Sequence, residues 1–533
     1  MKHVAPTAVA ALFLWAVVFF AGLGLPATAV PAEGPAILMF HGDPGRTGWM
    51  QDEHRLTPAA LRTGRFGTLW VSPVDGEIYA EPLVVSGVAV LGRVRTVVYV
   101  VTERDLIYAF DAADGGRLWG PVSLGSPVPG ALLPCGDIDP VGITSTPVLD
   151  RGAGTLYVVG LTTPDGGRAK TYLAAALDLK SGVARPGWPV PIAPPPSSGF
   201  TFHGGVEQQR GALLLTRGVV YVPFGGYRGG CGDYHGWIVA VPVPSPRRQQ
   251  SFATPAGRQG GIWAAGGIAA DLSGNLYAAT GAATAGPADL SDSVIRLATS
   301  PTLRFSGASR DFFTPSNVTA LNGTGVGLGA SAPLVVPDQP DLPTPHLVFI
   351  AGKQGIAYLV NRDNMGGVSR GTAIGREGVF SRCAFGTCER NVPEVFSAAA
   401  YWDGGSAGRV ILVPGRGRQP APCVGTGGIA ALRLGTAAGS RAPRLDVAWC
   451  SASMRDPGAP SVSGIGPDGG VVWVLDTGED AVLYGLDART GDTLFKSAAQ
   501  NAVGRTERFV TPAVVGGRVY IGAGDRVVAY GLR

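Results

Sequence analysis

The sequence of 533 residues has few charged residues and no long run of charge of one sign. Only 15% of the residues are charged, and 43 basic residues against 39 acidic ones leave a net charge of +4. This content is too low for a coiled coil or a disordered chain. Because no basic cluster could follow a phosphate backbone, the sequence also argues against a nucleic-acid partner.

Histidines and several catalytic motifs are scarce as well. The chain has six histidines, and none belongs to an H-E-x-x-H motif. A C-x-x-C-H haem attachment is missing, and the glycine-rich stretch 323–329 lacks the Lys-Ser/Thr pair of a phosphate-binding loop. A zinc protease, a covalently bound haem and a phosphate-loop enzyme are therefore not indicated.

Long hydrophobic runs are confined to the N-terminus. Lys2 and His3 precede an apolar stretch from Ala8 to Leu25, and a small-residue cleavage site, 27–29, follows. This order predicts a signal peptide over residues 1–29; an uncleaved membrane anchor is the alternative. No cysteine follows the stretch to carry a lipid, and no later segment is long enough to span a membrane. We expect an exported protein (secreted, periplasmic or in the cell envelope) without a membrane span after signal removal.

The cysteines are six in number, and none is adjacent to another or part of a C-x-x-C motif. An even count in an exported chain favours disulfides over a metal site, the alternative. Six cysteines allow 15 connectivities. Cys383 and Cys388 could close a short loop, and Cys423 and Cys450 lie in neighbouring segments. This choice would leave the remaining two, Cys135 and Cys231, as the third pair.

Glycine and proline, in contrast, are abundant, with 81 and 43 residues. Together with 45% hydrophobic residues, they predict many short strands joined by tight turns. One phrase recurs: a strand with an aromatic or large apolar residue, a turn, an apolar strand and Asp-x-x-x-Gly. Its copies are about 60 residues apart and align at Tyr99, Tyr157, Tyr221, Tyr277, Phe349, Ile411, Trp473 and Tyr520.

Eight copies of about four strands each predict an all-β chain folded as an eight-bladed β-propeller. The last copy ends at Tyr530 without a closing strand, and the early segment 67–70 supplies one. The N-terminal strand should therefore close the ring. We expect the signal peptide at 1–29, an N-terminal linker at 30–45 and the propeller at 46–533, with 186–200 and 242–250 as surface loops.

Residues 108–119, Tyr-Ala-Phe-Asp-Ala-Ala-Asp-Gly-Gly-Arg-Leu-Trp, resemble the pyrroloquinoline-quinone (PQQ) repeat of quinoprotein propellers. The resemblance covers nearly everything after residue 40. It implies a fold related to the quinoprotein alcohol dehydrogenases, with a tryptophan of each repeat packed between blades. Such tryptophans are Trp70, Trp119, Trp188 and Trp449. Longer phrases resemble exported bacterial PQQ-like propellers without established activity; they lie at 41–48, 234–237, 361–367 and 508–512.

Of the residues that carry quinone chemistry in the family, this sequence matches one and departs from the others. Lys353 matches a family residue that contacts the quinone carbonyls. However, the family's vicinal cysteine ring is missing, and Ala282 stands where a Ca²⁺-binding Asn is expected. The region that should carry the catalytic Asp, 321–329, has no carboxylate, and the context of Asp311 does not match the family. We therefore expect no catalytic residue, no metal ligand and no cofactor; PQQ with Ca²⁺ belongs to the alternative below.

A ligand-binding surface at the mouth of the channel is the remaining prediction. Tryptophan faces suit a planar or sugar-like ligand, and Arg and Lys suit its oxygen atoms. The alternative is structural: tryptophans packed between blades, arginines that bridge loops and a lysine exposed in a turn. The predicted binding residues are Arg210, His235, Trp237, Trp263, Lys353 and Arg508.

The sequence therefore favours a non-catalytic scaffold that binds a ligand or a protein. Its partner would be a small molecule, a carbohydrate or an envelope protein, and we expect a monomer. The alternative is a PQQ-dependent dehydrogenase that oxidises alcohols or sugars and has a degenerate Ca²⁺ site. A role in envelope protein assembly is a third hypothesis.

Overall fold

The computed structural model describes residues 1–3, 34–283, 289–371, 375–388, 392–436, 442–464, 466 and 469–533. The chain divides into two compact units, 1–33 and 34–533. Almost all of the predicted signal peptide lies outside the described residues, so the fold concerns the second unit. In the described part, no helix is both long enough and apolar enough for a membrane crossing.

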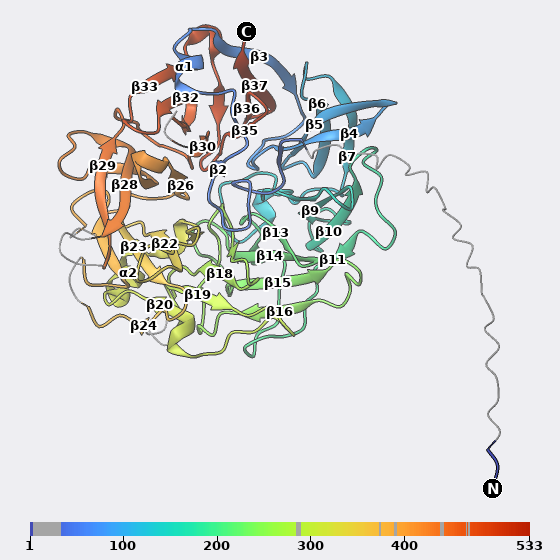
Figure 1. The fold of residues 1–533 in the computed structure, drawn as a ribbon. Helices are drawn as coiled ribbons and strands as arrows, with labels where there is room; N and C mark the ends of the chain where they lie inside the picture. The colour runs from blue at the N-terminus through green and yellow to red at the C-terminus, as the bar shows by residue number, and fades with distance from the viewer. Residues whose placement is uncertain are drawn as a thin grey trace. The chain divides into compact units, whose positions relative to one another are not determined.

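The described residues of the second unit form eight β-sheets, which follow one another in chain order round a common centre (Figure 1). We call them blades 1 to 8. Blade 1 contains β1 (Ala36–Ile37), β4 (Leu83–Val90), β5 (Arg93–Val101), β6 (Leu106–Asp111) and β7 (Arg117–Ser123). Blade 2 contains β8 (Val148–Asp150), β9 (Thr155–Thr162), β10 (Thr171–Asp178) and β11 (Val190–Pro191). Blade 3 contains β12 (Glu207–Gln208), β13 (Leu214–Thr216), β14 (Val219–Gly226), β15 (Trp237–Pro242) and β16 (Gln250–Ala253). Blade 4 contains β17 (Ala269–Ala270), β18 (Leu276–Ala279), β19 (Val294–Leu297), β20 (Phe312–Thr314) and β24 (Gly367–Val368).

The second half of the ring continues this pattern. Blade 5 contains β21 (Leu334–Val335), β22 (Leu347–Ala351), β23 (Ile356–Asn361) and β25 (Phe380–Cys383). Blade 6 contains β26 (Ala400–Asp403), β27 (Arg409–Arg418), β28 (Thr426–Thr436) and β29 (Pro443–Cys450). Blade 7 contains β30 (Ser461–Ser463), β31 (Val471–Asp476), β32 (Gly478–Asp487) and β33 (Thr493–Lys496), with β2 (Trp49–Met50) and β34 (Gly504–Thr506). Blade 8 contains β35 (Ala513–Val515), β36 (Arg518–Ala523), β37 (Arg526–Leu532) and β3 (Phe66–Pro73).

Helices are short wherever the chain is described. The α-helices are α1 (Pro58–Leu61) and α2 (Val318–Thr324). The 3-10 turns are η1 (Gly130–Leu132), η3 (Ser309–Asp311), η4 (Leu328–Ala330), η5 (Gly405–Ala407) and η6 (Ala499–Asn501). The all-β prediction is therefore confirmed.

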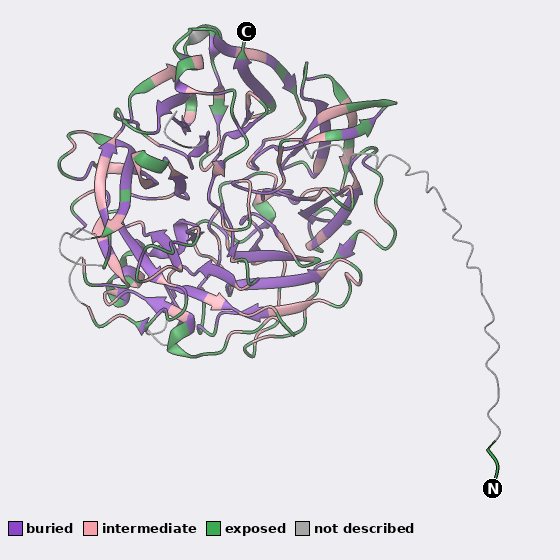
Figure 2. Ribbon diagram, viewed as in Figure 1, coloured by how far each residue is buried: buried purple, intermediate pink, exposed green. Residues whose placement is uncertain are grey.

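The predicted repeat coincides with the blades. Its eight aligned positions each fall in a middle strand: β5, β9, β14, β18, β22, β27, β31 and β36. All eight side chains are buried. Figure 2 shows why: the strands are buried over most of their length, and exposed residues gather in the loops and at the outer strands. An isolated blade could bury only one face, so the repeats are stable only as a closed ring.

The ring closes as predicted. β3 pairs antiparallel with β37, with Trp70 opposite Ala529, so an N-terminal strand completes the last blade. Trp70 also donates from Nε1 to the Ala112 carbonyl of blade 1, at 3.1 Å. The closure therefore combines a strand ladder within blade 8 with a side-chain hydrogen bond from blade 8 to blade 1.

The Asp-x-x-x-Gly phrase is explained by contacts between neighbouring blades. Trp119 and Trp449 repeat the contact of Trp70, each donating to the carbonyl that directly follows the Asp of the next blade, Leu179 and Ala488, at 3.0 Å. The Gly of each phrase has positive φ, and a Cβ there would fall within 3 Å of the tryptophan ring. Glycine therefore provides both the turn and the space for the neighbouring blade's tryptophan.

A segment of residues 36–53, the central segment, contacts every blade. Figure 1 shows it in blue near the centre of the ring. It pairs with blades 1 and 7 through β1 and β2. Backbone carbonyls of the segment accept hydrogen bonds from blades 2, 4, 5 and 6, and the Glu53 carboxylate accepts one from blade 8. The contact with blade 3 comes from the Arg46 side chain.

Arg46 is 1% exposed and donates to three carbonyls, those of Phe40, Leu213 and Ile268, each at 2.9 Å. These bonds join positions 6, 167 and 222 residues away in sequence. Residues 34–45 lie in the same compact unit as the blades, and residues 36–37 pair with β4 of blade 1.

The expected disulfides form. Cys135 is bonded to Cys231, Cys383 to Cys388 and Cys423 to Cys450, and no cysteine is free. One loop expectation was wrong: 186–200 contains β11, the outer strand of blade 2. The repeat spacing missed it because this strand has only two residues.

Candidate functional site

A cavity of about 360 Å³ lies among the loops of blades 3, 4 and 5. Three of the predicted binding residues, Arg210, Trp263 and Lys353, line it together. Arg210 follows β12, Trp263 precedes β17, and Lys353 lies in the turn between β22 and β23. Each side chain is half-buried. The structure thus gathers residues that are up to 143 positions apart in sequence into one site.

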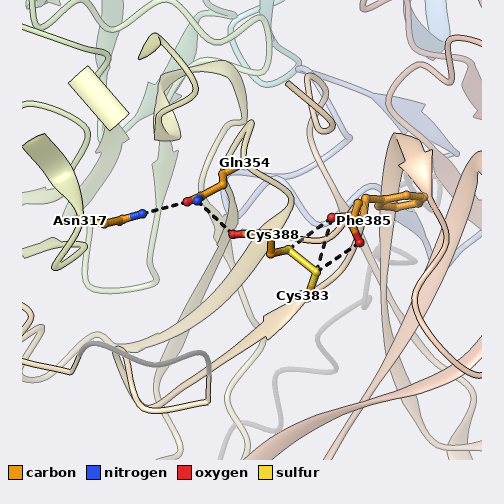
Figure 3. The surroundings of a disulfide bond; sticks show 6 residues. Asn317, Gln354, Cys383, Phe385 and Cys388 are labelled. Carbon is orange, nitrogen blue, oxygen red and sulfur yellow. Dashed lines mark hydrogen bonds between the residues drawn. A yellow bond between two sulfur atoms is a disulfide. The ribbon is translucent and has the colours of Figure 1, made fainter. Parts of the chain in front are cut away.

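Hydrogen bonds of both backbone groups of Lys353 fix the turn in which it lies. Its N–H donates to the Gly327 carbonyl at 3.0 Å, and its own carbonyl accepts from Glu394 at 2.6 Å. The next residue, Gln354, donates from Nε2 to the Cys388 carbonyl at 3.0 Å and accepts from Asn317 at 2.9 Å (Figure 3). The disulfide loop, residues 383–388, therefore supports the turn that carries Lys353.

The Lys353 ammonium group interacts with protein groups on two sides. Nζ donates to the Gly325 carbonyl at 3.1 Å and lies 4.9 Å from the centroid of the Trp263 ring. Burial lowers the pKa of Lys353, and the nearby Asp292 carboxylate opposes that shift. A half-buried ammonium over an indole face is a favourable cation–π arrangement. The ammonium group has three N–H donors and the Gly325 carbonyl accepts from one of them, so Nζ can also donate to an acceptor atom of a ligand in the cavity.

Trp263 owes its position to glycines. A Cβ at Gly281 or Gly329 would lie 2.8 or 2.9 Å from Trp263 Nε1, closer than real Cβ atoms approach. The glycine-rich stretch 323–329 thus makes room for the indole ring. Consequently the ring stays at the cavity wall, where it can stack against a planar group.

Asp292 is a cavity residue that the sequence analysis missed. It is fully buried, its Oδ1 accepts from Leu328 N at 3.1 Å, and its Oδ2 has no hydrogen-bond partner among the described residues. Burial raises the pKa of Asp292 to about 7, although the Leu328 bond and Lys353 act in the opposite direction. A buried carboxyl group that lines a cavity and titrates near neutrality is a feature of functional sites.

The chemical environment of Asp292 could not be inferred from its neighbours in sequence. Residues 289–293, Asp-Leu-Ser-Asp-Ser, look like a polar loop before β19. The tertiary structure instead packs Gly327 against this side chain, so closely that a Cβ at Gly327 would lie 1.7 Å from Asp292 Oδ1. The backbone of blade 5's glycine-rich loop therefore covers the carboxyl group directly.

Arg210 connects this cavity with a smaller one of about 10 Å³, which Arg508 also lines. The Arg210 guanidinium lies 4.4 Å from the Phe509 ring centroid, and burial lowers its pKa. Arg508 is exposed and lies 3.8 Å from Asp456. The structure thus places Arg508 beside Arg210 but outside the larger cavity.

His235 and Trp237 lie elsewhere in blade 3. His235 is buried, stacks on Phe200 with ring centroids 3.7 Å apart, and has a pKa that burial lowers. Trp237 is fully buried in β15 and donates from Nε1 to Glu207 at 3.2 Å. Their rings face other protein side chains, so the structure does not bring either residue to the cavity.

The residues around the cavity do not fit a Ca²⁺ ion. Calcium takes six to eight oxygen ligands, mostly carboxylates and carbonyls. Asp292 is the single carboxylate among the described lining residues, and its Oδ1 is already bonded to Leu328. Ala282 also lines the cavity, with no oxygen in its side chain. Across the described chain, no group of three or more His, Cys, Asp or Glu side chains is arranged to hold a metal.

No protein-family model and no curated protein matches the sequence. Solved structures do match. A quinohemoprotein alcohol dehydrogenase from Pseudomonas putida HK5 has a TM-score of 0.59 and 14% identity, over 94% of this chain and 80% of that one. A quinohemoprotein alcohol dehydrogenase from Comamonas testosteroni has a TM-score of 0.57 and 14% identity, over 93% and 80%. A europium-containing methanol dehydrogenase has a TM-score of 0.58 and 12% identity, over 94% and 99%. These likenesses establish the quinoprotein-type propeller fold and confirm the predicted resemblance at that level.

Proposed function

We propose that the propeller is a non-catalytic binding protein whose cavity takes a small, planar molecule with acidic oxygen atoms. The observation that carries this proposal is the Lys353 ammonium group 4.9 Å above the Trp263 ring, at the wall of a cavity that Arg210 also lines. Trp263 offers a stacking face, and the two cations offer donors for carboxylate or carbonyl oxygens. The cavity volume, about 360 Å³, is in the range of small-molecule sites.

The second candidate is a PQQ-dependent dehydrogenase, favoured by the fold and by the position of Lys353. The residues would suit the planar, oxygen-rich part of such a cofactor. They do not fit the Ca²⁺ ion of such an enzyme, since the described lining residues include one carboxylate and the metal needs several oxygen ligands. We therefore derive no dehydrogenase reaction for this chain.

Calorimetric titration of the mature protein tests the proposal. The probes are PQQ with and without Ca²⁺, 2,6-naphthalenedicarboxylate as a planar acid without a quinone, and glucuronate as an acidic sugar. We expect saturable binding of a planar acid without Ca²⁺, with a change in tryptophan fluorescence. Binding of PQQ only with Ca²⁺, together with dye reduction by alcohols, would instead make the protein a dehydrogenase. If none of the probes bound, the cavity proposal would fail.

We also propose that the protein acts outside the cytoplasm as a monomer. Three disulfides support the location outside the cytoplasm, because such bonds persist in oxidising compartments. N-terminal sequencing of the exported protein should find Val30 as the first residue, and light scattering should give the mass of one chain. A protein that retains residues 1–29 would carry an uncleaved anchor.

A further inference from the structure

A groove of about 820 Å³ lies at the seam between blade 8 and blade 1, away from the cavity of blades 3–5. It is rich in arginine: Arg55, Arg93, Arg95 and Arg518 all line it. The single carboxylate among its described lining residues, Asp111, is buried and paired with Arg95.

The other three arginines have no ion pair or side-chain hydrogen bond with the described residues, and two of them, Arg55 and Arg93, are exposed. The protein as a whole is nearly neutral, with a net charge of +4 on 533 residues. Three arginines without an ion-pair partner among the described residues therefore give this groove a local excess of positive charge. A guanidinium group pairs with a carboxylate through two parallel hydrogen bonds, so the groove suits a partner with several carboxylates.

The groove also contains a free strand edge. β5 begins at Arg93, but its pairing with β6 ends where Val97 lies opposite Asp111. One more bond follows, from Ala112 N to the Thr96 carbonyl at 2.9 Å. Beyond it, residues 93–95 have β4 on one side and, in the described chain, no strand on the other.

An exposed apolar side chain lies on this edge, and another lies in the turn before it. Val94 of the edge is 75% exposed and Leu91 of the turn 73%, and Figure 1 shows the hairpin of β4 and β5 projecting outward from blade 1. An open edge of this kind accepts an extended peptide, whose backbone bonds supply affinity and whose alternate side chains supply specificity. An acidic polysaccharide would match the arginines but has no backbone amides to pair with the edge.

We propose that this groove binds an extended acidic peptide segment of a partner protein. The peptide adds as a strand beside residues 93–95 of β5, its carboxylates pair with Arg93, Arg518 and Arg55, and its intervening apolar residues contact Val94. This interaction is independent of ligand binding in the cavity. The partner that fits carries alternating acidic and aliphatic residues in a segment without fixed structure.

Fluorescence anisotropy of the full mature chain with a fluorescein-labelled (Glu-Val)4 peptide tests the proposal. We expect saturable binding that weakens as salt is raised, because exposed ion pairs are screened. The double variant R93Q/R518Q should bind about tenfold more weakly, since it removes the charge pairs of two arginines with the peptide. R247Q/R248Q, in an exposed loop of blade 3, loses the same charge and should bind like wild type.

Two further probes separate strand addition from simple charge attraction. A (Glu-Val)4 peptide with alternate amides N-methylated keeps its carboxylates but cannot extend the sheet, and we expect its affinity to fall at least about fivefold. An oligogalacturonate presents carboxylates without amides and should bind more weakly than the peptide. Tighter binding of the oligogalacturonate, equal binding of the methylated peptide, equal loss in the two double variants or no binding of (Glu-Val)4 would each overturn the proposal.

Discussion

Lys353 Nζ lies 4.9 Å from the centroid of the Trp263 ring, although the two residues come from different blades. The hydrogen bonds around Gln354 and the disulfide loop fix the lysine, and the glycines of two loops fix the tryptophan. The site is thus assembled before any ligand enters. Preorganisation of this kind lowers the entropic cost of binding.

Substitution of Lys353 by methionine should weaken binding of a planar acid about tenfold, because the cavity loses its ammonium donor. Calorimetry measures the change. K496M is the matched control, since Lys496 Nζ lies 5.3 Å from the Tyr484 ring in blade 7, outside the cavity. Similar losses in both variants would contradict a specific role for Lys353.

Asp292 predicts a dependence of stability on pH. Its pKa is raised from 3.8 to about 7, so the unfolded chain gives up this proton at a lower pH than the folded chain does. The stabilisation from the protonated form is therefore complete below about pH 4 and lost as pH rises to about 7. Relative to D292N, wild type should lose up to about 4 kcal/mol of unfolding free energy over this range.

Urea denaturation of both proteins at pH 4 and pH 8 tests this dependence. The comparison with D292N cancels the effects of other buried carboxyl groups, such as Glu81 and Glu103, whose pKa values burial raises to about 8. D114N, at an exposed turn, controls for the loss of one charge. A constant difference between wild type and D292N at the two pH values would show that Asp292 titrates normally.

Arg46 should be among the most sensitive positions for stability. R46M would leave three buried carbonyl groups without their donor and would remove the positive charge near the Asp43 and Glu81 carboxyl groups. We expect a loss of about 3–5 kcal/mol in the free energy of unfolding. R117M, at an exposed position of β7, should change it by less than about 0.5 kcal/mol. Equal stability of the two variants would show that the central segment does not hold the blades together.

The closure of the ring can be tested through the indole nitrogen of Trp70. W70F keeps an aromatic ring between blades 8 and 1 but removes the bond to the Ala112 carbonyl, at 3.1 Å. It should cost about 1 kcal/mol more than W188F, whose indole nitrogen makes no hydrogen bond in the described structure. Thermal unfolding of both variants measures the difference, and a larger loss in W188F would be incompatible with this account.

The fold could be predicted because its signals are local. Alternating apolar residues define each strand, and Asp111 and Gly115 mark a turn within a few residues of chain. The closing strand followed from the missing strand of the last repeat. In contrast, β11 and β1 escaped prediction, since a strand of two residues has no periodicity, and β1 pairs with a segment almost 50 residues away.

The sequence by itself determined the number of blades and the closure of the ring, and it offered, among 15 possibilities, the cysteine pairing that the structure has. Those features depend on patterns that recur every 60 residues or so, or on residues close in the chain. Only the tertiary structure decided which polar residues meet. It placed Asp292 near Lys353, packed Trp237 away from the cavity and buried Arg46 against carbonyls of blades 3 and 4. It also left Arg93 in an open strand edge. The physical reason is that burial, charge partners and free strand edges are set by contacts between blades, and these contacts join residues far apart in sequence.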